Sequence, residues 1–291
     1  MTARDSKATI KTLIKKRYAY FDHIEIWVDT ETKILDRSTR QKIKKQGANV
    51  SIVPLKISPF QGEYRTKLEL TQVNPQVLQI LQAAFDQHAC AYLIARIEFT
   101  VDWVTETPEQ ARTLQRLFEQ YFIHRCRRRA APPFYFENVH QDADSAGTSY
   151  FSPKDSRGLV PLIYSSRQKR RSGDQPCAHF EYRLTTTAAC KRHNFRVLQD
   201  LIECDILAFM RQHVTFIAKP SKEDVGRALA SAANPSRRTL ERCCNDFFKQ
   251  RQTTLEQIPI QQLLSWLPEL HALAQKKTPA HLTKIADLFF K

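Results

Sequence analysis

The chain has 291 residues, of which 42% are hydrophobic, enough for a sizeable core in one large domain or in a main domain with a smaller one. Its formal net charge of +15, from 45 Lys and Arg against 30 Asp and Glu, favours a polyanionic partner, with nucleic acid first. No apolar stretch reaches the length of about 20 residues that a membrane span needs, and the first residues lack the apolar core of a signal peptide. The sequence therefore predicts a cytoplasmic protein without a membrane partner.

The cysteines and histidines exclude several kinds of site. The seven cysteines are irregularly spaced and form no C-x-x-C pattern, which predicts reduced, mostly buried thiols. No two histidines stand two residues apart, so the three-histidine metal site of one class of DNA nickase is not expected. A Walker-type phosphate loop is also absent, which argues against an ATPase or helicase motor.

The first part of the chain alternates strand and helix patterns. Residues 7–20 form a basic, partly amphipathic lead-in. After it, period-2 alternation predicts strands and apolar residues at helical spacing predict helices. The strands are expected at 21–28, 50–57 and 63–70, and the helices at 33–45 and 75–88.

The same order of patterns then begins again. The strongest strand pattern, at 92–103, is followed by a helix that starts at Pro108, by three short strands and by a long helix. The three strands are expected near 146–152, 159–166 and 178–186, and the long helix at 195–213. The fold class predicted for residues 1–218 is α+β, with a twisted antiparallel sheet and an internal duplication as an option.

Residues 219–291 show no strand pattern and are predicted to form an all-helical C-terminal subdomain. Ser236, after Pro235, is expected to cap a helix that begins at 237. Two roles remain open for this region: it contacts DNA, or it only covers the sheet. The helices are expected at 221–232, 236–251, 258–274 and 279–290.

The strand at 96–102 places polar residues on one face. Because side chains alternate along a strand, Glu98 and Asp102 share a face with Arg96 and Thr100. The two carboxylates lie about 13 Å apart on a straight strand, too far to hold one ion together. One of them can still be a metal ligand, and the alternative is an exposed polar face.

A second strand carries His179, Glu181 and Arg183 on one face. A carboxylate between these groups is a candidate ligand for Mg²⁺ or Mn²⁺. The alternative is an ion pair across strands.

Tyr164 ends an apolar strand, 159–164, and is followed at once by a basic run. A phenol, with a pKa near 10, needs a metal, a cation or a general base in order to attack a phosphodiester. The basic run offers such cations, which would also bind phosphate. The alternative is an edge tyrosine beside a solvated loop. The cations are Arg167, Lys169, Arg170 and Arg171.

The order and spacing of these segments resemble the replication initiation factor family, which includes rolling-circle initiators of plasmids, filamentous-phage replication proteins and some conjugative nickases. The resemblance covers about residues 50–215. The matching segments are YRTKLEL at 64–70, RIE at 96–98 with Asp102, GTSYFSPKDS at 147–156, LIY at 162–164 and HFEYR at 179–183.

The resemblance implies a metal-dependent DNA nicking-closing enzyme, an endonuclease with topoisomerase-like chemistry. Tyr164 would match the nucleophile, and Glu98, Asp102 and Glu181 the acidic positions that hold Mg²⁺ or Mn²⁺. The chain departs from the family at Leu162, where the pattern has Arg, at Ser166, where it has Lys, and at His179, where it has Arg. Tyr150 and Tyr182 remain alternative nucleophiles, although Tyr182 faces away from Glu181 on its strand.

The resemblance also implies partners: origin DNA, single-stranded or supercoiled, with a host helicase and polymerase and, as an option, a second copy of the chain. A non-cutting DNA-binding initiator or regulator is the alternative function, and a structural or RNA-binding basic protein is the third. Aromatics at 134–136, after a basic segment, could stack on bases, or belong to the core. The predicted DNA-binding residues are Arg96, Arg125, Arg127, Arg128, Arg129, Lys154, Arg157, Arg167, Lys169, Arg170, Arg171 and Arg183.

Overall fold

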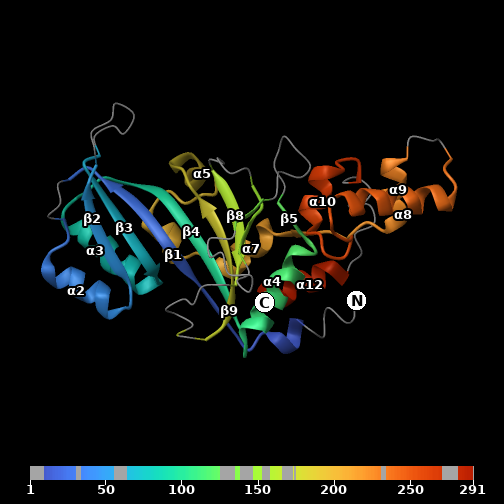
Figure 1. Cartoon of the computed structure of the whole chain (residues 1–291). Helices are drawn as coiled ribbons and strands as arrows, with labels where there is room; N and C mark the ends of the chain where they lie inside the picture. The colour runs from blue at the N-terminus through green and yellow to red at the C-terminus, as the bar shows by residue number, and fades with distance from the viewer. Residues whose placement is uncertain are drawn as a thin grey trace.

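The protein is a mixed α+β structure with a long antiparallel sheet and a mostly helical C-terminal region (Figure 1). It is known from a computed structural model. The structure describes residues 10–30, 34–55, 64–124, 135–137, 147–152, 158–165, 173, 175–230, 234–270 and 281–290.

One sheet has eight strands in the order β2-β3-β1-β4-β9-β8-β7-β6, and neighbouring strands in it are antiparallel. A separate two-stranded sheet pairs β10 with β5. The strands are β1 (Lys16–Val28), β2 (Asn49–Pro54), β3 (Thr66–Val73), β4 (Tyr92–Val104), β5 (Phe122–Ile123), β6 (Tyr135–Glu137), β7 (Thr148–Tyr150), β8 (Leu159–Tyr164), β9 (Cys177–Leu184) and β10 (Thr215–Phe216).

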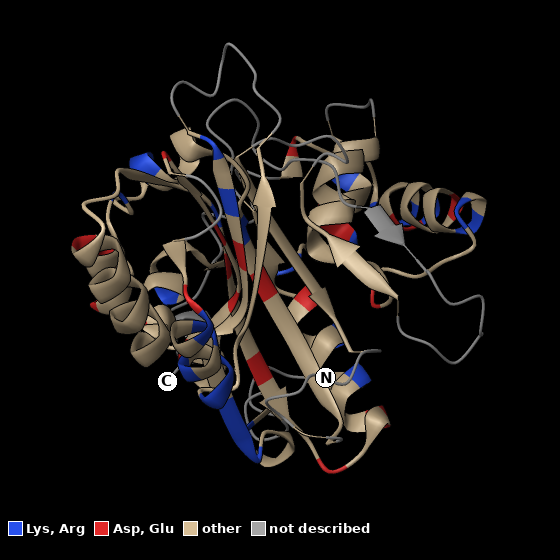
Figure 2. Cartoon of the chain, turned by 90° about the vertical axis from the view of Figure 1, so that its left-hand side faces the viewer, with Lys and Arg blue, Asp and Glu red and all other residues tan. Residues whose placement is uncertain are grey.

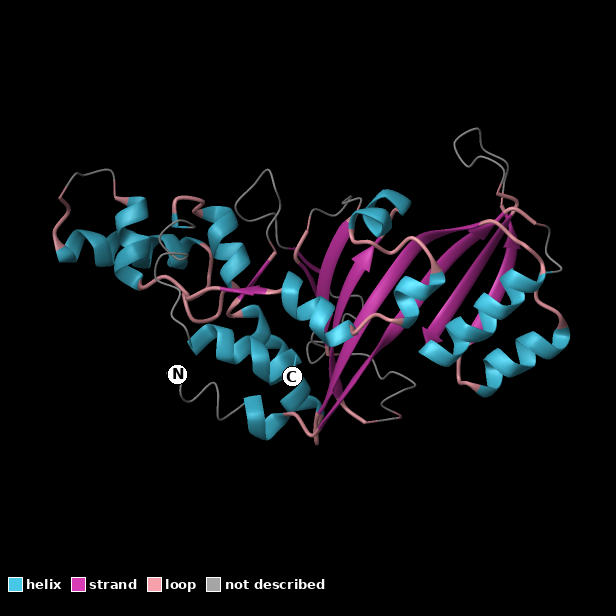
Figure 3. Cartoon of the chain, turned by 180° about the vertical axis from the view of Figure 1, so that it is seen from behind, coloured by secondary structure: helices cyan, strands magenta, loops and turns pink. Residues whose placement is uncertain are grey.

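Helices cover one face of the large sheet, as the view from behind shows (Figure 3). Two of them begin at the prolines from which the sequence predicts them, Pro75 for α3 and Pro108 for α4. In the structure a side chain just before each proline caps the helix: Asn74 for α3 and Thr107 for α4. The helices are α2 (Arg37–Lys45), α3 (Pro75–Gln87), α4 (Pro108–Glu119), α5 (Thr187–Arg192), α6 (Leu198–Ile202), α7 (Ile206–His213), α8 (Lys222–Leu229), α9 (Arg237–Gln250), α10 (Ile260–Trp266) and α12 (His281–Phe290).

The two halves of the sheet repeat one order of elements. In the first half, β1 is followed by α2 and the pair β2 and β3, and β3 lies between β1 and β2. In the second half, β4 is followed by α4 and later by β8 and β9, and β9 lies between β4 and β8. The two halves meet where β1 pairs with β4, at the centre of the sheet.

The C-terminal helices α8, α9 and α10 build a second, smaller core beyond the two-stranded sheet (Figure 1). Helices α8 and α9 approach so closely that a Cβ on Gly226 would lie 2.5 Å from the backbone oxygen of Leu240. Helix α12 instead returns to the main core, where the Trp103 indole donates a hydrogen bond of 2.7 Å to the Phe289 carbonyl. A domain boundary at residue 218 remains a prediction.

The structure corrects three expected elements. The helix predicted at 195–213 is two short helices, α6 and α7, because Asp205 caps a new helix by accepting from the Ala208 amide. The strand predicted at 21–28 begins earlier, at Lys16, inside the basic lead-in. The helix pattern that starts at Pro108 continues in the sequence to Arg129, but the helix α4 ends at Glu119. The chain then enters the short strand β5. Within the described part of the chain, no helix is both long and apolar enough to cross a membrane.

Candidate metal and tyrosine site

The central strand β4 separates two kinds of side chain, as its alternation predicts. Phe99, Val101 and Trp103 lie in the hydrophobic core under the helices. Glu98, Thr100 and Asp102 lie on the opposite face, yet they are also buried, with 7%, 0% and 0% of their surface exposed. The expected alternative of a solvent-exposed polar face is therefore wrong. Figure 2 shows acidic positions along the central strands.

An irregularity in β1 brings another carboxylate to this face. The pairing of β1 with β4 shifts between Phe21 and His23, so that Asp22 is an extra residue beside the pair His23 and Glu98. Such a bulge interrupts the alternation of side chains along a strand. Asp22 can therefore reach Glu98 although Ile24, two residues further along the strand, packs in the core.

Three carboxylates meet at this point. Oxygens of Asp22, Glu98 and Glu181, from β1, β4 and β9, lie within 4.8 Å of one another. Glu181 is 1% exposed, and it stands opposite Thr100 in the register of β4 and β9. Neighbouring strands thus bring together acidic groups that are far apart in the sequence.

Two arginines partner these carboxylates. Arg183 donates to Glu181 Oε2 at 2.6 Å and lies 3.5 Å from Glu98 Oε1, and Arg96 forms an ion pair with Glu98. Burial opposes the charge of Arg183, but its acidic neighbours Glu181 and Glu98 outweigh this effect and raise its pKa above the usual value. Both guanidinium groups therefore stabilise the ionised form of the carboxylates that they contact.

The phenol of Tyr164 points into the same group. Its hydroxyl donates to Glu181 Oε1, and the residue is 3% exposed. Burial, followed by the charge of Glu181 and the hydrogen bond to it, raises the pKa of Tyr164 above that of a free phenol. The tyrosine is therefore protonated at neutral pH in this arrangement.

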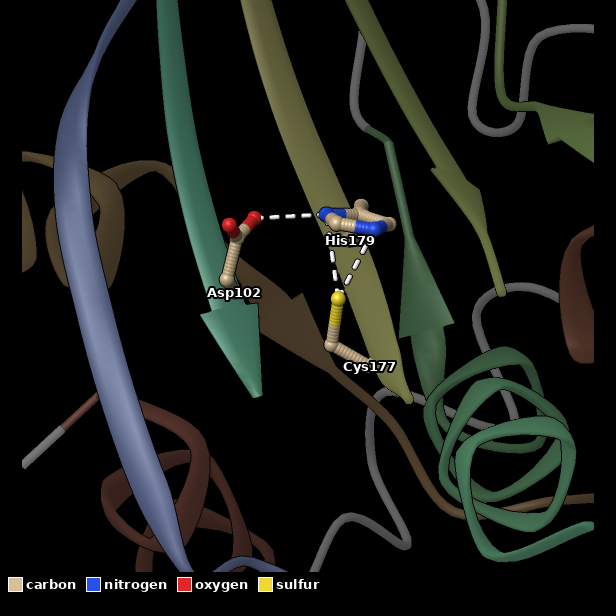
Figure 4. Close-up of side chains that lie close together, drawn as sticks. All are labelled: Asp102, Cys177 and His179. Atoms are coloured by element: carbon tan, nitrogen blue, oxygen red, sulfur yellow. Dashed lines mark hydrogen bonds and ion pairs between the residues drawn. The ribbon is translucent and has the colours of Figure 1, made fainter. Parts of the chain in front are cut away.

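A second polar cluster lies beside the first (Figure 4). His179 Nδ1 donates to Asp102 Oδ1 at 2.6 Å, and His179 Nε2 lies 2.9 Å from Cys177 Sγ. The Tyr20 hydroxyl donates to the other Asp102 oxygen at 2.9 Å. Burial opposes the imidazolium, but the hydrogen bonds to Asp102 and Cys177 outweigh it and raise the pKa of His179 to about 10.

The structure brings together only part of the predicted site. Glu98 and Glu181 lie with Tyr164, whereas the Asp102 carboxylate bonds to His179 and Tyr20. Of the alternative nucleophiles, Tyr182 packs in the apolar core on the other side of the sheet, and Tyr150 lies on β7 opposite Leu162.

Of the predicted DNA-binding residues, Arg96 and Arg183 lie at the carboxylates. The rest fall outside the described residues: Arg125, Arg127, Arg128, Arg129, Lys154, Arg157, Arg167, Lys169, Arg170 and Arg171.

Asp22 is not predicted as a ligand from the sequence, although it falls in a predicted strand. The strand pattern at 21–28 puts Asp22 on the face of Ile24, which is a core residue. Only the bulge breaks that rule, and the consecutive polar residues Asp22 and His23 are the one signal of it in the sequence.

The chemistry of the carboxylate group fits a hard divalent cation. An ion such as Mg²⁺ takes oxygen ligands at about 2.1 Å, which holds them within about 4.2 Å of each other, so small side-chain movements suffice. In addition, the buried Thr100 hydroxyl on this face has no hydrogen-bond partner among the described residues. An unsatisfied buried hydroxyl is costly, and a cation with its bound water would satisfy it.

Comparison with solved structures shows a similarity of fold. The fold is similar to a solved structure described as a rolling circle replication initiator protein from Geobacillus stearothermophilus, with a TM-score of 0.37 and 12% identity, over 84% of this chain and 100% of that one. No protein-family model matches the sequence, and no curated protein matches it. A similarity at this TM-score and identity concerns the fold alone.

Proposed function

We propose that the protein nicks one strand of DNA with Tyr164 and becomes linked to the 5′ phosphate at a replication origin. The observation that carries the proposal is the contact of the Tyr164 hydroxyl with Glu181, inside a group of three carboxylates of which Glu98 and Glu181 are buried. A phenol at an acidic, cation-binding group is the arrangement that tyrosine attack on a phosphodiester requires.

The chain's own groups divide the work of this reaction. The Tyr164 oxygen attacks the phosphorus, the bond from phosphorus to the 3′ oxygen breaks, and a free 3′ hydroxyl remains to prime synthesis. Glu181 accepts the hydrogen bond of the phenol and is therefore placed to take its proton. Arg96 and Arg183 stand beside the carboxylates, where a guanidinium can also bind a phosphate oxygen.

Asp22, Glu98 and Glu181 would hold Mg²⁺ or Mn²⁺. When bound, the cation supplies a Lewis acid for the scissile phosphate. In the absence of a cation, burial and Glu181 hold the pKa of Tyr164 high, so the chain alone disfavours the phenolate. The proposal therefore predicts that nicking depends on the metal.

The positive charge of the chain supports DNA as the substrate. The net charge of +15 is enough for strong, salt-dependent attraction to phosphates. The described helix α9 adds an exposed basic surface with Arg237, Arg238 and Arg242. We propose that this surface and the predicted basic residues of the loops position origin DNA, while a host helicase and polymerase continue the replication.

The test is formation of a covalent adduct. Single-stranded and supercoiled DNA with the origin of the chain's own genetic element is incubated with the protein and Mn²⁺ or Mg²⁺, and the products are separated on a denaturing protein gel. A shifted band that needs the metal, disappears with EDTA and is absent from Tyr164→Phe supports the proposal.

Tyr182→Phe is the matched control, because it removes the same hydroxyl from the opposite face of the sheet. Its adduct should equal that of the wild type. A band that survives in Tyr164→Phe would leave a nickase with another nucleophile, and Tyr150 would be examined next. Origin binding without an adduct under either metal would favour the non-cutting initiator or regulator instead.

A further inference from the structure

Asp102, Cys177 and His179 form a group of metal-binding side chains that the proposed nicking reaction does not use. Their donor atoms lie within 4.8 Å of one another, and the three residues are 0%, 2% and 0% exposed. Asp102 comes from β4, and the other two come from successive positions on the same face of β9 (Figure 4).

The donor atoms distinguish this group from the carboxylates nearby. Three carboxylates offer only oxygen and suit a hard cation, whereas a thiolate, an imidazole and a carboxylate suit Zn²⁺ and related ions. The sulfur is decisive, because Mg²⁺ and Ca²⁺ take oxygen ligands. These two groups on the same face of the sheet thus differ in the metal that they prefer.

The distances allow one ion to reach all three donors. In a tetrahedral zinc site with bonds of about 2.0–2.3 Å, ligand atoms lie about 3.3–3.8 Å apart. His179 Nδ1 is 3.8 Å from Cys177 Sγ and 2.6 Å from Asp102 Oδ1. For an ion to replace the proton between His179 and Asp102, the distance from His179 Nδ1 to Asp102 Oδ1 must increase by about 1 Å or less.

We propose that Asp102, Cys177 and His179 bind one thiophilic divalent cation of the Zn²⁺ type, separate from the cation of the carboxylate site. The ion links β4 to β9 and takes the place of the Cys177 proton and of the His179 proton that faces Asp102. Three protein ligands leave one position for water. The proposal does not depend on nicking.

The site has a structural consequence for Tyr164. The Tyr164 and His179 rings pack with centroids 4.9 Å apart, and the two residues stand opposite each other in the register of β8 and β9. An ion on His179 fixes the imidazole in place, and the imidazole in turn supports the tyrosine ring. Metal at this site would therefore rigidify the sheet beside the carboxylates without contacting them.

Co²⁺ is the probe, because a thiolate ligand gives it an intense near-ultraviolet charge-transfer band that oxygen and nitrogen ligands do not. The full chain is stripped with chelator and titrated with Co²⁺, followed by displacement with Zn²⁺. We expect the band to saturate at one ion per chain, to fall on adding Zn²⁺, and to be lost in Cys177→Ser. Cys190→Ser, which removes another buried thiol from α5, should keep it.

A wild-type measurement covers the case in which Cys177→Ser does not fold. Thiols are alkylated during partial unfolding with and without Zn²⁺, and the modified cysteines are mapped by mass spectrometry. Selective protection of Cys177 supports the site. The proposal is overturned if the wild type shows no thiolate band, or if protection by Zn²⁺ is absent or equal at all cysteines.

Binding of Mn²⁺ to the carboxylates is measured separately by electron paramagnetic resonance. Cys177→Ser should retain this Mn²⁺ signal, and Glu98→Gln should retain the Co²⁺ band. Loss of both signals in either variant would mean one shared site and would contradict two separate ones.

Discussion

The two faces of β4 are both buried, but they are built from opposite chemistry. On one face Phe99, Val101 and Trp103 pack under helices, where the hydrophobic effect stabilises the fold. On the other face Glu98, Thr100 and Asp102 are equally removed from water. Burial of carboxylates is costly, and it is offset here by arginine, histidine and tyrosine partners.

Under the proposed function, the apolar face stabilises the sheet and the polar face carries the reaction. An apolar face of the same size would stabilise the sheet at least as well as paired charges do. A buried acidic face with an unsatisfied Thr100 hydroxyl therefore contributes little to the stability of the sheet, and binding of a cation is the better explanation for it. Substitutions on the two faces should separate stability from activity.

The largest effect is expected on the apolar face. Phe99→Ala removes a fully buried ring that packs against Phe21, Phe195 and Phe209. The free energy of unfolding should fall by about 3–5 kcal/mol, as measured by urea denaturation. A loss below about 1 kcal/mol would mean that this face is not the core.

On the polar face, Glu98→Gln should act on nicking. It removes one carboxylate of the proposed cation site and keeps the shape of the side chain, while Arg96 can turn to solvent because 36% of its side chain is exposed. We expect the rate of adduct formation to fall about a hundredfold to a thousandfold. The free energy of unfolding should fall by less than in Phe99→Ala, because losing the ion pairs with Arg96 and Arg183 also removes the repulsion between Glu98 and its acidic neighbours; a large loss of stability with an unchanged rate would reverse the assignment of the faces.

The ion pair of His179 and Asp102 predicts a dependence on pH in metal-free protein. The folded pKa of His179, about 10, lies above the unfolded value of about 6.5. A raised pKa contributes stability that is complete below the unfolded value and is lost as the pH rises through the folded one. The difference in unfolding free energy between wild type and His179→Gln should therefore shrink from about pH 6 to about pH 10.5. A constant difference would show that the imidazole is neutral in the fold.

The smallest effect is expected at Thr100. Thr100→Val replaces a buried hydroxyl without a partner by a methyl group of similar size. Without metal, stability should rise by about 1 kcal/mol, measured by thermal unfolding. With Mn²⁺ present the gain should shrink, because the hydroxyl then has a cation or its water to contact. Destabilisation without metal would show that the hydroxyl already has a partner.

The sequence predicted the sheet and part of the site. The alternation at 92–103 correctly predicts β4 and the separation of Glu98 from Phe99, because this pattern is a local property of the chain. Pro75 and Pro108 likewise mark the starts of α3 and α4. The metal, the nucleophile and the DNA contacts remain proposals.

The rest of the site depends on pairing between strands, which no single segment shows. Asp22 reaches Glu98 only through a bulge, and Asp102 meets His179 because the two stand opposite each other in the register of β4 and β9. The alternation within one strand shows which side chains share a face, but not which strand lies beside it. His179 is an example: the sequence places it on one face with Glu181, but its hydrogen-bond partner Asp102 lies on the neighbouring strand β4.

The central claim is that Tyr164 attacks DNA at the carboxylate group, and mapping the adduct tests it most directly. The covalent complex formed with Mn²⁺ is digested with nuclease and protease, and the peptide that carries the remaining nucleotide is sequenced by mass spectrometry. We predict the nucleotide on Tyr164, through a 5′ phosphate. A nucleotide on Tyr150, Tyr182 or any other residue, or no adduct although origin DNA is bound, would contradict the account.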